Sequence, residues 1–420
     1  MKIFERIVDG RIREIVRLST NQCGFVAGCG TIDAIHAVRL LVERHREKQK
    51  PLHLAFLDLE KAFDRVPREV IWYALRQHGV PEELIEWVRI LYSCPKSQVR
   101  APAGTSTEFP ISVGVHQGSA LSPLLFIVVM DAISRDLQKP APWTLLYADD
   151  VMLASEDKAE LERQVQAWCD RLAAFGLKLN VQKSEYLTTD VNETGSIEIN
   201  GTALVRATHF KYLGSAIASD GSLTCEVNSR VSAAWSKWRS MTGVLCDRKI
   251  PERLKSKIYR TAVRPVAIYG AECWPATEEF ESRLSVMETK MLRWTAGVTR
   301  LDLIRNVSIR QMFDVAADKL REARLRWYGL VLRANDDTVR KIGLTDVPGK
   351  WPKGRPKQRW IDTLHMDLKV AGIHPDQAFD RAKWRHCTRK ADPAAKRDRR
   401  WGRRGIKRRR RKDFLTLARK

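Results

Sequence analysis

The stretch Leu145–Ser155 reads Leu-Leu-Tyr-Ala-Asp-Asp-Val-Met-Leu-Ala-Ser. Apolar, β-favouring residues lie on both sides of two adjacent aspartates, which predicts a buried hairpin whose turn carries Asp149 and Asp150. Two neighbouring carboxylates in apolar surroundings repel each other and lose hydration, so a cation is expected to offset them. A divalent metal ion is the usual solution. For an isolated pair, the alternative is a solvated Asp-Asp turn between two core strands.

A second carboxylate-containing run favours the metal. Residues 52–64 read Leu-His-Leu-Ala-Phe-Leu-Asp-Leu-Glu-Lys-Ala-Phe-Asp, which puts Asp58 at the end of an apolar strand, with helix-like spacing after it. An aspartate at a strand end beside an aspartate pair on a hairpin predicts a two-metal site. Such a site holds the attacking and leaving oxygens in line during phosphoryl transfer.

Five blocks of sequence carry a family resemblance. The chain resembles the reverse transcriptases of non-LTR retrotransposons (LINE-type elements), closest to the RTE-like clade, and corresponds to the C-terminal part of such a polymerase. The blocks follow the order and spacing of polymerase motifs A to E, and they are Phe56–Asp64, Gly114–Phe126, Tyr147–Asp150, Gly176–Ser184 and Phe210–Ser215. Five blocks in order make chance a poor explanation.

The resemblance implies an α+β right-hand polymerase. Its expected parts are truncated fingers, a palm with a split βαββ-like sheet, a helical thumb and a basic, mainly helical C-terminal region. The boundaries predicted from the sequence are 1–215 for fingers and palm, 216–300 for the thumb-like region, 301–395 for the basic region and 396–420 for a basic tail. Because the helix predicted over 1–15 lies inside the fingers of the family, we expect incomplete fingers and impaired activity.

The catalytic residues that the resemblance implies are Asp58, Asp149, Asp150 and Lys183. The three aspartates would hold two Mg²⁺ ions, or Mn²⁺, together with the backbone carbonyl of Leu59. Lys183 matches the lysine of motif D and would protonate or neutralise the leaving pyrophosphate. A solvated lysine at a loop end is the alternative.

Three further residues are expected to bind the nucleotide. Phe63 occupies the family's steric-gate position, where an aromatic ring would exclude a ribose 2′-hydroxyl. The alternative for Phe63 is ordinary core packing on the inward face of a helix. Gln117 offers amide donors and acceptors, and Gly118 allows close approach of the backbone to the nucleotide.

The charge is distributed unevenly. The formal net charge is +24, and residues 301–420 contribute 34 basic residues against 14 acidic ones. This asymmetry predicts a nearly neutral catalytic body followed by a region that binds a polyanion. The expected nucleic-acid contacts are Lys211, Lys353, Arg355, Arg408, Arg409, Arg410 and Arg411. Gly354-Arg355-Pro356 is similar to the centre of an AT-hook, although a linker explains it equally well.

Between 225 and 300 the sequence predicts helices that are rich in tryptophan and arginine. The aromatic residues of 231–245 and 251–269, among them Trp235 and Trp238, are assigned to packing. The basic residues of 251–269 are assigned to phosphate contacts with a nucleic-acid duplex, and they are Lys255, Lys257, Arg260 and Arg264.

Eight cysteines without a C-x-x-C pair fit a reducing compartment. No signal peptide is visible and no apolar run is long enough to span a bilayer, so no membrane partner is expected. The predicted location is intracellular, in a cytoplasmic RNA-protein particle and the nucleus.

The function predicted from these features is RNA-directed DNA polymerisation, with an RNA template, a DNA primer and dNTPs as partners. The alternative is a non-catalytic nucleic-acid-binding remnant of such an element, in which the palm survives only as a scaffold.

Overall fold

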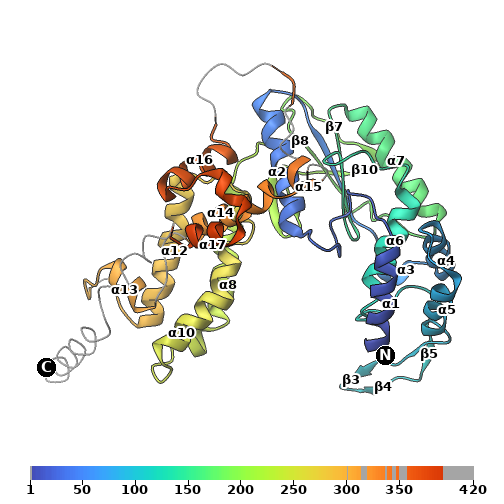
Figure 1. The fold of residues 1–420 in the computed structure, drawn as a ribbon, viewed down its shortest axis with the longest axis horizontal. Helices are drawn as coiled ribbons and strands as arrows, with labels where there is room; N and C mark the ends of the chain where they lie inside the picture. The colour runs from blue at the N-terminus through green and yellow to red at the C-terminus, as the bar shows by residue number, and fades with distance from the viewer. Residues whose placement is uncertain are drawn as a thin grey trace. The chain divides into compact units, whose positions relative to one another are not determined.

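The computed structural model describes residues 2–299, 301–313, 319–335, 338–342, 347–349 and 357–390. The chain forms two compact units (Figure 1). The first contains residues 1–222 and 335–356, and the second contains 223–334 and 357–420. The predicted boundaries at 215, 300 and 395 describe functional parts and stay predictions.

A five-stranded sheet forms the centre of the first unit. Its order is β11 (Val205–Arg206), β8 (Glu185–Thr188), β1 (His53–Leu57), β7 (Asp150–Ser155) and β6 (Thr144–Tyr147). The central strand β1 pairs antiparallel with both β7 and β8. All five residues of β1 are buried.

Both faces of β1 are covered, which explains the uninterrupted apolar run Leu54–Leu57 within it. Ala55 and Leu57 belong to one core cluster with residues of α6 (Ser122–Ser134) and α7 (Lys158–Ala174). On the other face, Phe56 stacks on Phe210 with ring centroids 4.1 Å apart. Phe210 lies on the hairpin formed by β12 (His209–Tyr212) and β13 (Ser215–Ala218).

Helix α7 has one apolar face. Leu161, Val165, Trp168 and Leu172 recur at helical spacing, and all four are buried. The helix begins after Asp157, whose side chain accepts a hydrogen bond from the Glu160 amide at 2.9 Å.

Further helices complete the first unit (Figure 1). They are α1 (Lys2–Ile15), α2 (Thr31–Glu47), α3 (Ala62–Arg65), α4 (Arg68–Gln77) and α5 (Glu82–Leu91). Short strand pairs are formed by β2 (Lys96–Ser97) with β5 (Phe109–Pro110), β3 (Arg100–Ala101) with β4 (Gly104–Thr105), and β9 (Glu198–Ile199) with β10 (Thr202–Ala203).

A late segment of the chain also belongs to the first unit. Helix α15 (Val339–Ile342) packs on α2. The Arg340 guanidinium forms an ion pair with Asp33, whose second oxygen lies 3.1 Å from Arg340 Nη2. Asp33 is only 2% exposed and also accepts a hydrogen bond from the Gly30 amide at 2.7 Å. The pair therefore neutralises a buried carboxylate on α2.

The described part of the second unit is helical. Its elements are α8 (Thr224–Arg239), α9 (Thr242–Leu245), α10 (Glu252–Ile258), a π-helix (Tyr259–Val263), α11 (Arg264–Ala267), a 3-10 turn (Ala271–Cys273), α12 (Glu278–Ala296), α13 (Asn306–Met312), α14 (Lys319–Leu332), α16 (Trp360–Ala371), a second 3-10 turn (Pro375–Phe379) and α17 (Arg381–Lys390). Across the described residues of both units, no helix is long and apolar enough to cross a bilayer.

Candidate active site

The strands β6 and β7 form the predicted hairpin. Tyr147 pairs with Asp150, so the turn consists of Ala148 and Asp149. Asp150 is the first residue of β7 rather than a turn residue, which corrects the prediction that both aspartates lie in the turn. Ala148 has a φ of 58°, a value that the first turn position of a type II′ hairpin requires and that normally favours glycine.

Asp58 comes to the same end of the sheet from β1. The register pairs Leu57 with Val151, so its continuation places Asp58 opposite Asp150. The structure thus brings a strand-end aspartate to the hairpin that carries the aspartate pair, as the sequence predicted.

The three carboxylates influence one another electrostatically. Desolvation and repulsion by Asp58 raise the pKa of Asp149. Desolvation, followed by repulsion from Asp149 and Asp58, raises the pKa of Asp150 to about 6. Asp150 lies exposed at the end of its strand. A cation bound between the carboxylates would relieve the part of this pKa shift that comes from their repulsion.

None of these three aspartates forms an ion pair with a cationic side chain among the described residues. Lys178, which lines a cleft together with Asp58, forms its ion pair with Glu60 instead, at 3.4 Å. Within the described ranges, no three acidic, histidine or cysteine side chains already converge on one point as a finished metal site. The donor chemistry nonetheless fits Mg²⁺, which prefers carboxylate and carbonyl oxygens.

Backbone hydrogen bonds fix Asp58 against the motif D loop. The Asp58 amide donates to Ser184 Oγ at 3.1 Å, and the Asn180 amide donates to the Asp58 carbonyl at 2.8 Å. Sequence reasoning did not assign roles to Ser184 or Asn180, although both lie in the block that contains Lys183. The carbonyl oxygen of the neighbouring Leu59 accepts no hydrogen bond from the described residues. That oxygen remains available to a ligand.

A cleft of about 760 Å³ opens beside Asp58. It is lined by residues 58–61 and 178–183, two segments that are hydrogen-bonded to each other through their backbones, and by Thr202. Lys183 lines this cleft and is exposed, so its ammonium group can reach a ligand there. The motif A and motif D segments therefore line one cleft.

The position of Phe63 is compatible with both roles considered for it, the steric gate and core packing. It stacks on Phe126 of α6 with ring centroids 4.4 Å apart, yet it remains half-buried and keeps part of its ring exposed. Gln117 is exposed, and its amide nitrogen donates to Asp64 Oδ1 at 2.8 Å. Gly118 has a φ of 84° with open space where a side chain would start. The positive φ is thus the reason for glycine at this position.

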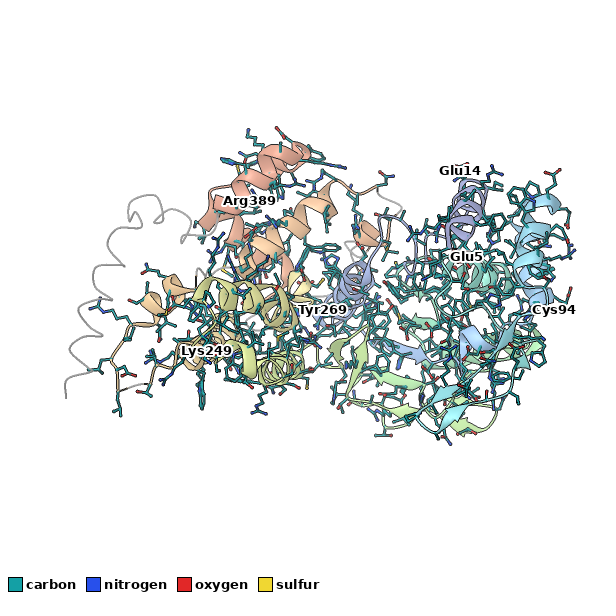
Figure 2. All side chains as sticks on the ribbon, turned by 90° about the horizontal axis from the view of Figure 1, so that it is seen from below. Glu5, Glu14, Cys94, Lys249, Tyr269 and Arg389 are labelled. Atoms are coloured by element: carbon teal, nitrogen blue, oxygen red, sulfur yellow. The ribbon has the colours of Figure 1, made fainter. Side chains whose placement is uncertain are left out.

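Helix α1 supports this turn. Glu5, labelled in Figure 2, accepts a hydrogen bond from the Ala120 amide at 2.9 Å. The contact connects the first helix of the chain to the segment that begins α6. No pattern in the sequence pointed to it, because the two residues are 115 positions apart.

Comparison with known families identifies the polymerase part of the chain. The family profile described as "Reverse transcriptase (RNA-dependent DNA polymerase)" matches residues 1–217. The chain belongs to the reverse transcriptase family. The matched region contains every block from motif A to the start of the β12–β13 hairpin.

Relatives of this reverse transcriptase are polymerases of non-LTR retrotransposons. The retrovirus-related Pol polyprotein from type-1 retrotransposable element R2 of Nasonia vitripennis is 29% identical over 88% of this chain and 41% of its own length. The RNA-directed DNA polymerase from mobile element jockey of Drosophila funebris is 25% identical over 91% of this chain and 42% of its own. The chain thus spans about two fifths of these relatives. Placement in the RTE-like clade stays a prediction.

A solved structure of telomerase from Candida albicans, in complex with a fragment of telomeric RNA, is also similar. The likeness covers 79% of this reverse transcriptase and 54% of the telomerase chain, with 13% sequence identity and a TM-score of 0.38.

The β12–β13 hairpin contains the motif E block, Phe210–Ser215. Leu213 and Gly214 form its turn with φ values of 46° and 83°. Lys211 is exposed on β12. Its predicted contact with nucleic acid stays a prediction. The other predicted nucleic-acid contacts lie outside the described residues, and these are Lys353, Arg355, Arg408, Arg409, Arg410 and Arg411.

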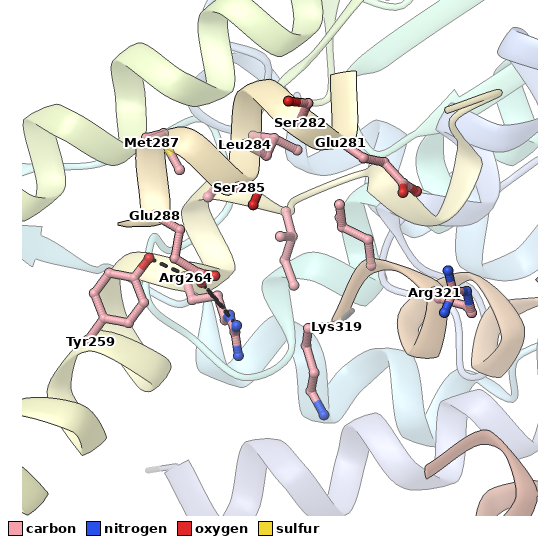
Figure 3. Close-up of a pocket in the computed structure, with 13 residues that line it drawn as sticks. Tyr259, Arg264, Glu281, Ser282, Leu284, Ser285, Met287, Glu288, Lys319 and Arg321 are labelled. Carbon is pink, nitrogen blue, oxygen red and sulfur yellow. Dashed lines mark hydrogen bonds and ion pairs between the residues drawn. The ribbon is translucent and has the colours of Figure 1, made fainter. Parts of the chain in front are cut away.

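Two basic residues of the second unit contradict their predicted role. Arg264 is 7% exposed and pairs with Glu288 at 2.9 Å, beside a cavity of about 250 Å³ (Figure 3). Tyr259 donates to the same glutamate at 3.3 Å. Lys255 is 6% exposed, with its ammonium group 3.5 Å from the Thr295 carbonyl. Both cations therefore stabilise the helical core instead of presenting charge to phosphate. The sequence could not distinguish these positions, since helical spacing does not identify the buried face of a strongly basic helix.

The two tryptophans assigned to packing lie in or against the core of this unit. Trp238 is 5% exposed, and Trp235 packs against the same cluster with its ring centroid 5.6 Å from that of Trp238. Trp294 of α12 is 68% exposed.

Proposed function

We propose that this chain catalyses RNA-directed DNA synthesis, extending a DNA primer on an RNA template. The observation that carries the proposal is the group of three mutually repelling carboxylates, Asp58, Asp149 and Asp150, at one end of a buried sheet. These side chains have no cationic partner within the described structure. Carboxylates in such a state favour a divalent cation over any arrangement of the protein alone.

The reaction is a nucleotidyl transfer. The primer 3′-oxygen forms a bond to the α-phosphorus of a dNTP, the bond from that phosphorus to the oxygen shared with the β-phosphate breaks, and pyrophosphate leaves. Two Mg²⁺ ions, or Mn²⁺, would supply Lewis acidity at the attacking and leaving oxygens when bound. The three aspartates and the Leu59 carbonyl would hold them.

Other residues of the first unit act on the nucleotide. Lys183 neutralises or protonates the leaving pyrophosphate from the cleft that it shares with Asp58. The exposed part of the Phe63 ring excludes a ribose 2′-hydroxyl, while its other contacts hold it on Phe126. Gln117 and Gly118 present an amide and an open backbone to the nucleotide.

Nucleic-acid binding is assigned to Lys211 and to the basic residues after 300. We expect the protein to act in a cytoplasmic RNA-protein particle and in the nucleus.

The test is primer extension by the purified chain on an RNA template. We expect parent activity that depends on Mg²⁺ or Mn²⁺, and a loss of ~10²-fold to 10³-fold or more in Asp149→Asn, because an amide does not replace the carboxylate charge at a metal. Asp170→Asn is the matched control. Asp170 is an exposed aspartate of α7 that accepts only a hydrogen bond from Gln166 Nε2 at 2.8 Å in the described structure. Absence of extension by the folded parent would favour the non-catalytic remnant, and full activity of Asp149→Asn would overturn the assignment of the site.

A further inference from the structure

A short segment near the start of the chain lies along the catalytic hairpin. The Leu146 amide donates to the Asn21 carbonyl at 2.9 Å, and the Cys23 amide donates to the Leu146 carbonyl at 2.8 Å. Gln22 is thus bridged in parallel to Leu146 of β6. The segment around Gln22 is therefore joined by a single parallel bridge to the edge strand β6.

The side chain of Gln22 reaches the turn itself. Gln22 is 3% exposed, and its Oε1 accepts hydrogen bonds from the Ala148 amide at 3.1 Å and from the Gly24 amide at 2.8 Å. Its Nε2 has no hydrogen-bond partner among the described residues. All the polar contacts of this buried side chain therefore run through the oxygen that holds the turn.

The turn has a reason to need this support. Ala148 has a left-handed φ of 58°, which is unfavourable for a residue with a Cβ. The Ala148 amide belongs to the Tyr147–Ala148 peptide, which begins the turn, so the orientation of that peptide sets the course of the backbone that carries the Asp149 carboxylate. An acceptor fixed to the amide holds the less favourable conformation in place.

Gly24 allows the segment to lie this close. A Cβ at Gly24 would lie 2.3 Å from the Ala148 nitrogen and 2.9 Å from the Tyr147 carbonyl carbon. Both atoms belong to the backbone, so the clash could not be relieved by a side-chain rotation. Only glycine fits, and the contact lies within one residue of Asp149.

We propose that Gln22 is a positioning residue of the active site, whose side-chain oxygen orients the Tyr147–Ala148 peptide and thereby the turn that carries the Asp149 carboxylate. This inference rests on the proposed polymerase function for its kinetic consequence but not for its structural one. Displacement of a catalytic group by about 1 Å costs on the order of 10²-fold in rate. Loss of the Gln22 oxygen is therefore expected to lower kcat by roughly 10-fold to 100-fold.

Two substitutions separate positioning from general stability. Gln22→Met keeps the side-chain volume but removes the acceptor. Gln22→Glu keeps an acceptor for both amides and adds negative charge near the aspartates. We expect Gln22→Met to lower kcat while the KM for dNTP and the affinity for template-primer stay unchanged. Gln22→Glu should retain most of the kcat and reach half-maximal activity at a lower Mg²⁺ concentration, because the added charge attracts the cation.

Hydrogen exchange gives a readout that does not require activity. In the metal-free protein, the peptide covering 145–152 should exchange faster in Gln22→Met, since the Ala148 amide loses its acceptor, and should exchange at the parent rate in Gln22→Glu. Gln166→Met is the matched control. The Gln166 side chain bonds to Asn200 and Asp170 on the outer face of α7, so its loss should change neither readout.

The outcomes are distinct. Parent exchange of the hairpin together with parent kcat in Gln22→Met would overturn the proposal, as would equal effects of Gln22→Met and Gln22→Glu. If the parent chain does not extend primers, the proposed function fails, and the exchange of residues 145–152 still decides whether Gln22 holds the turn. If Gln22→Met does not fold, parent exchange and a lowered Mg²⁺ requirement in Gln22→Glu support the proposal, and faster exchange in that variant refutes it.

Discussion

The repulsion among the site carboxylates predicts that Asp150→Asn stabilises the metal-free protein while it abolishes primer extension. The pKa of Asp150 is raised to about 6 from an ordinary value of 3.8, so the folded state holds its proton more tightly than the unfolded state does. The contribution of Asp150 to the free energy of unfolding is therefore fully present below pH 4, and it is lost as the pH rises towards 6. This difference corresponds to at most ~3 kcal/mol at neutral pH. Because Asp150 is exposed, solvent screening reduces our expected gain for the asparagine variant to ~1 kcal/mol.

The measurement is urea unfolding in EDTA at pH 4 and pH 7.5, followed by hydrogen exchange of the peptides that contain β1 and β7. The parent should lose stability between these pH values more than Asp150→Asn does, and Mg²⁺ should stabilise the parent more than the variant. Asp170→Asn, the exposed control on α7, should follow the parent at both pH values. A parent that is as stable as Asp150→Asn at pH 7.5 without metal would refute the electrostatic reasoning.

Three further perturbations test other parts of the molecule. Phe63→Ala should raise incorporation of ribonucleotides relative to deoxynucleotides, and it should lower the free energy of unfolding by ~2 kcal/mol because the stack on Phe126 is lost. Unchanged sugar discrimination in the folded variant would show that Phe63 serves only packing. Arg340→Met should destabilise the first unit by ~3 kcal/mol in urea unfolding, since it leaves Asp33 buried without its cation, and pairing it with Asp33→Asn should recover part of that loss. Deletion of 396–420 should weaken binding to RNA and DNA without sequence preference. Each lost phosphate contact should reduce the slope of log affinity against log salt concentration by about 0.7 on single strands and about 0.9 on duplex. An unchanged slope would exclude the tail from binding.

The catalytic elements could be predicted because their signals are local. The apolar run before Asp58, the paired aspartates within Leu145–Ser155 and the apolar face of α7 each depend on residues close together in sequence. Periodicity and turn chemistry read such patterns directly. The meeting of Asp58 with the aspartate pair followed from the family resemblance, and the strand register is consistent with it.

The supporting contacts could not be predicted in the same way. Gln22 is 126 positions from Ala148 in the sequence. Lys255 and Arg264 occur in helices so basic that charge gave no indication of which side is buried. Each of these contacts is decided by tertiary pairing, which a single sequence does not encode in any short pattern.

The position of α15 has a consequence for how the first unit is made. Residues 1–222 leave the ribosome before the second unit, yet the cation that neutralises Asp33 arrives only with Arg340. Until then the nascent polymerase unit has a carboxylate on α2 without this cation. A gene fragment that stops where the family match ends, at residue 217, would remain permanently in that incomplete state. Expression of the catalytic half for biochemistry should therefore retain the segment that returns to α2, or supply it as a separate peptide.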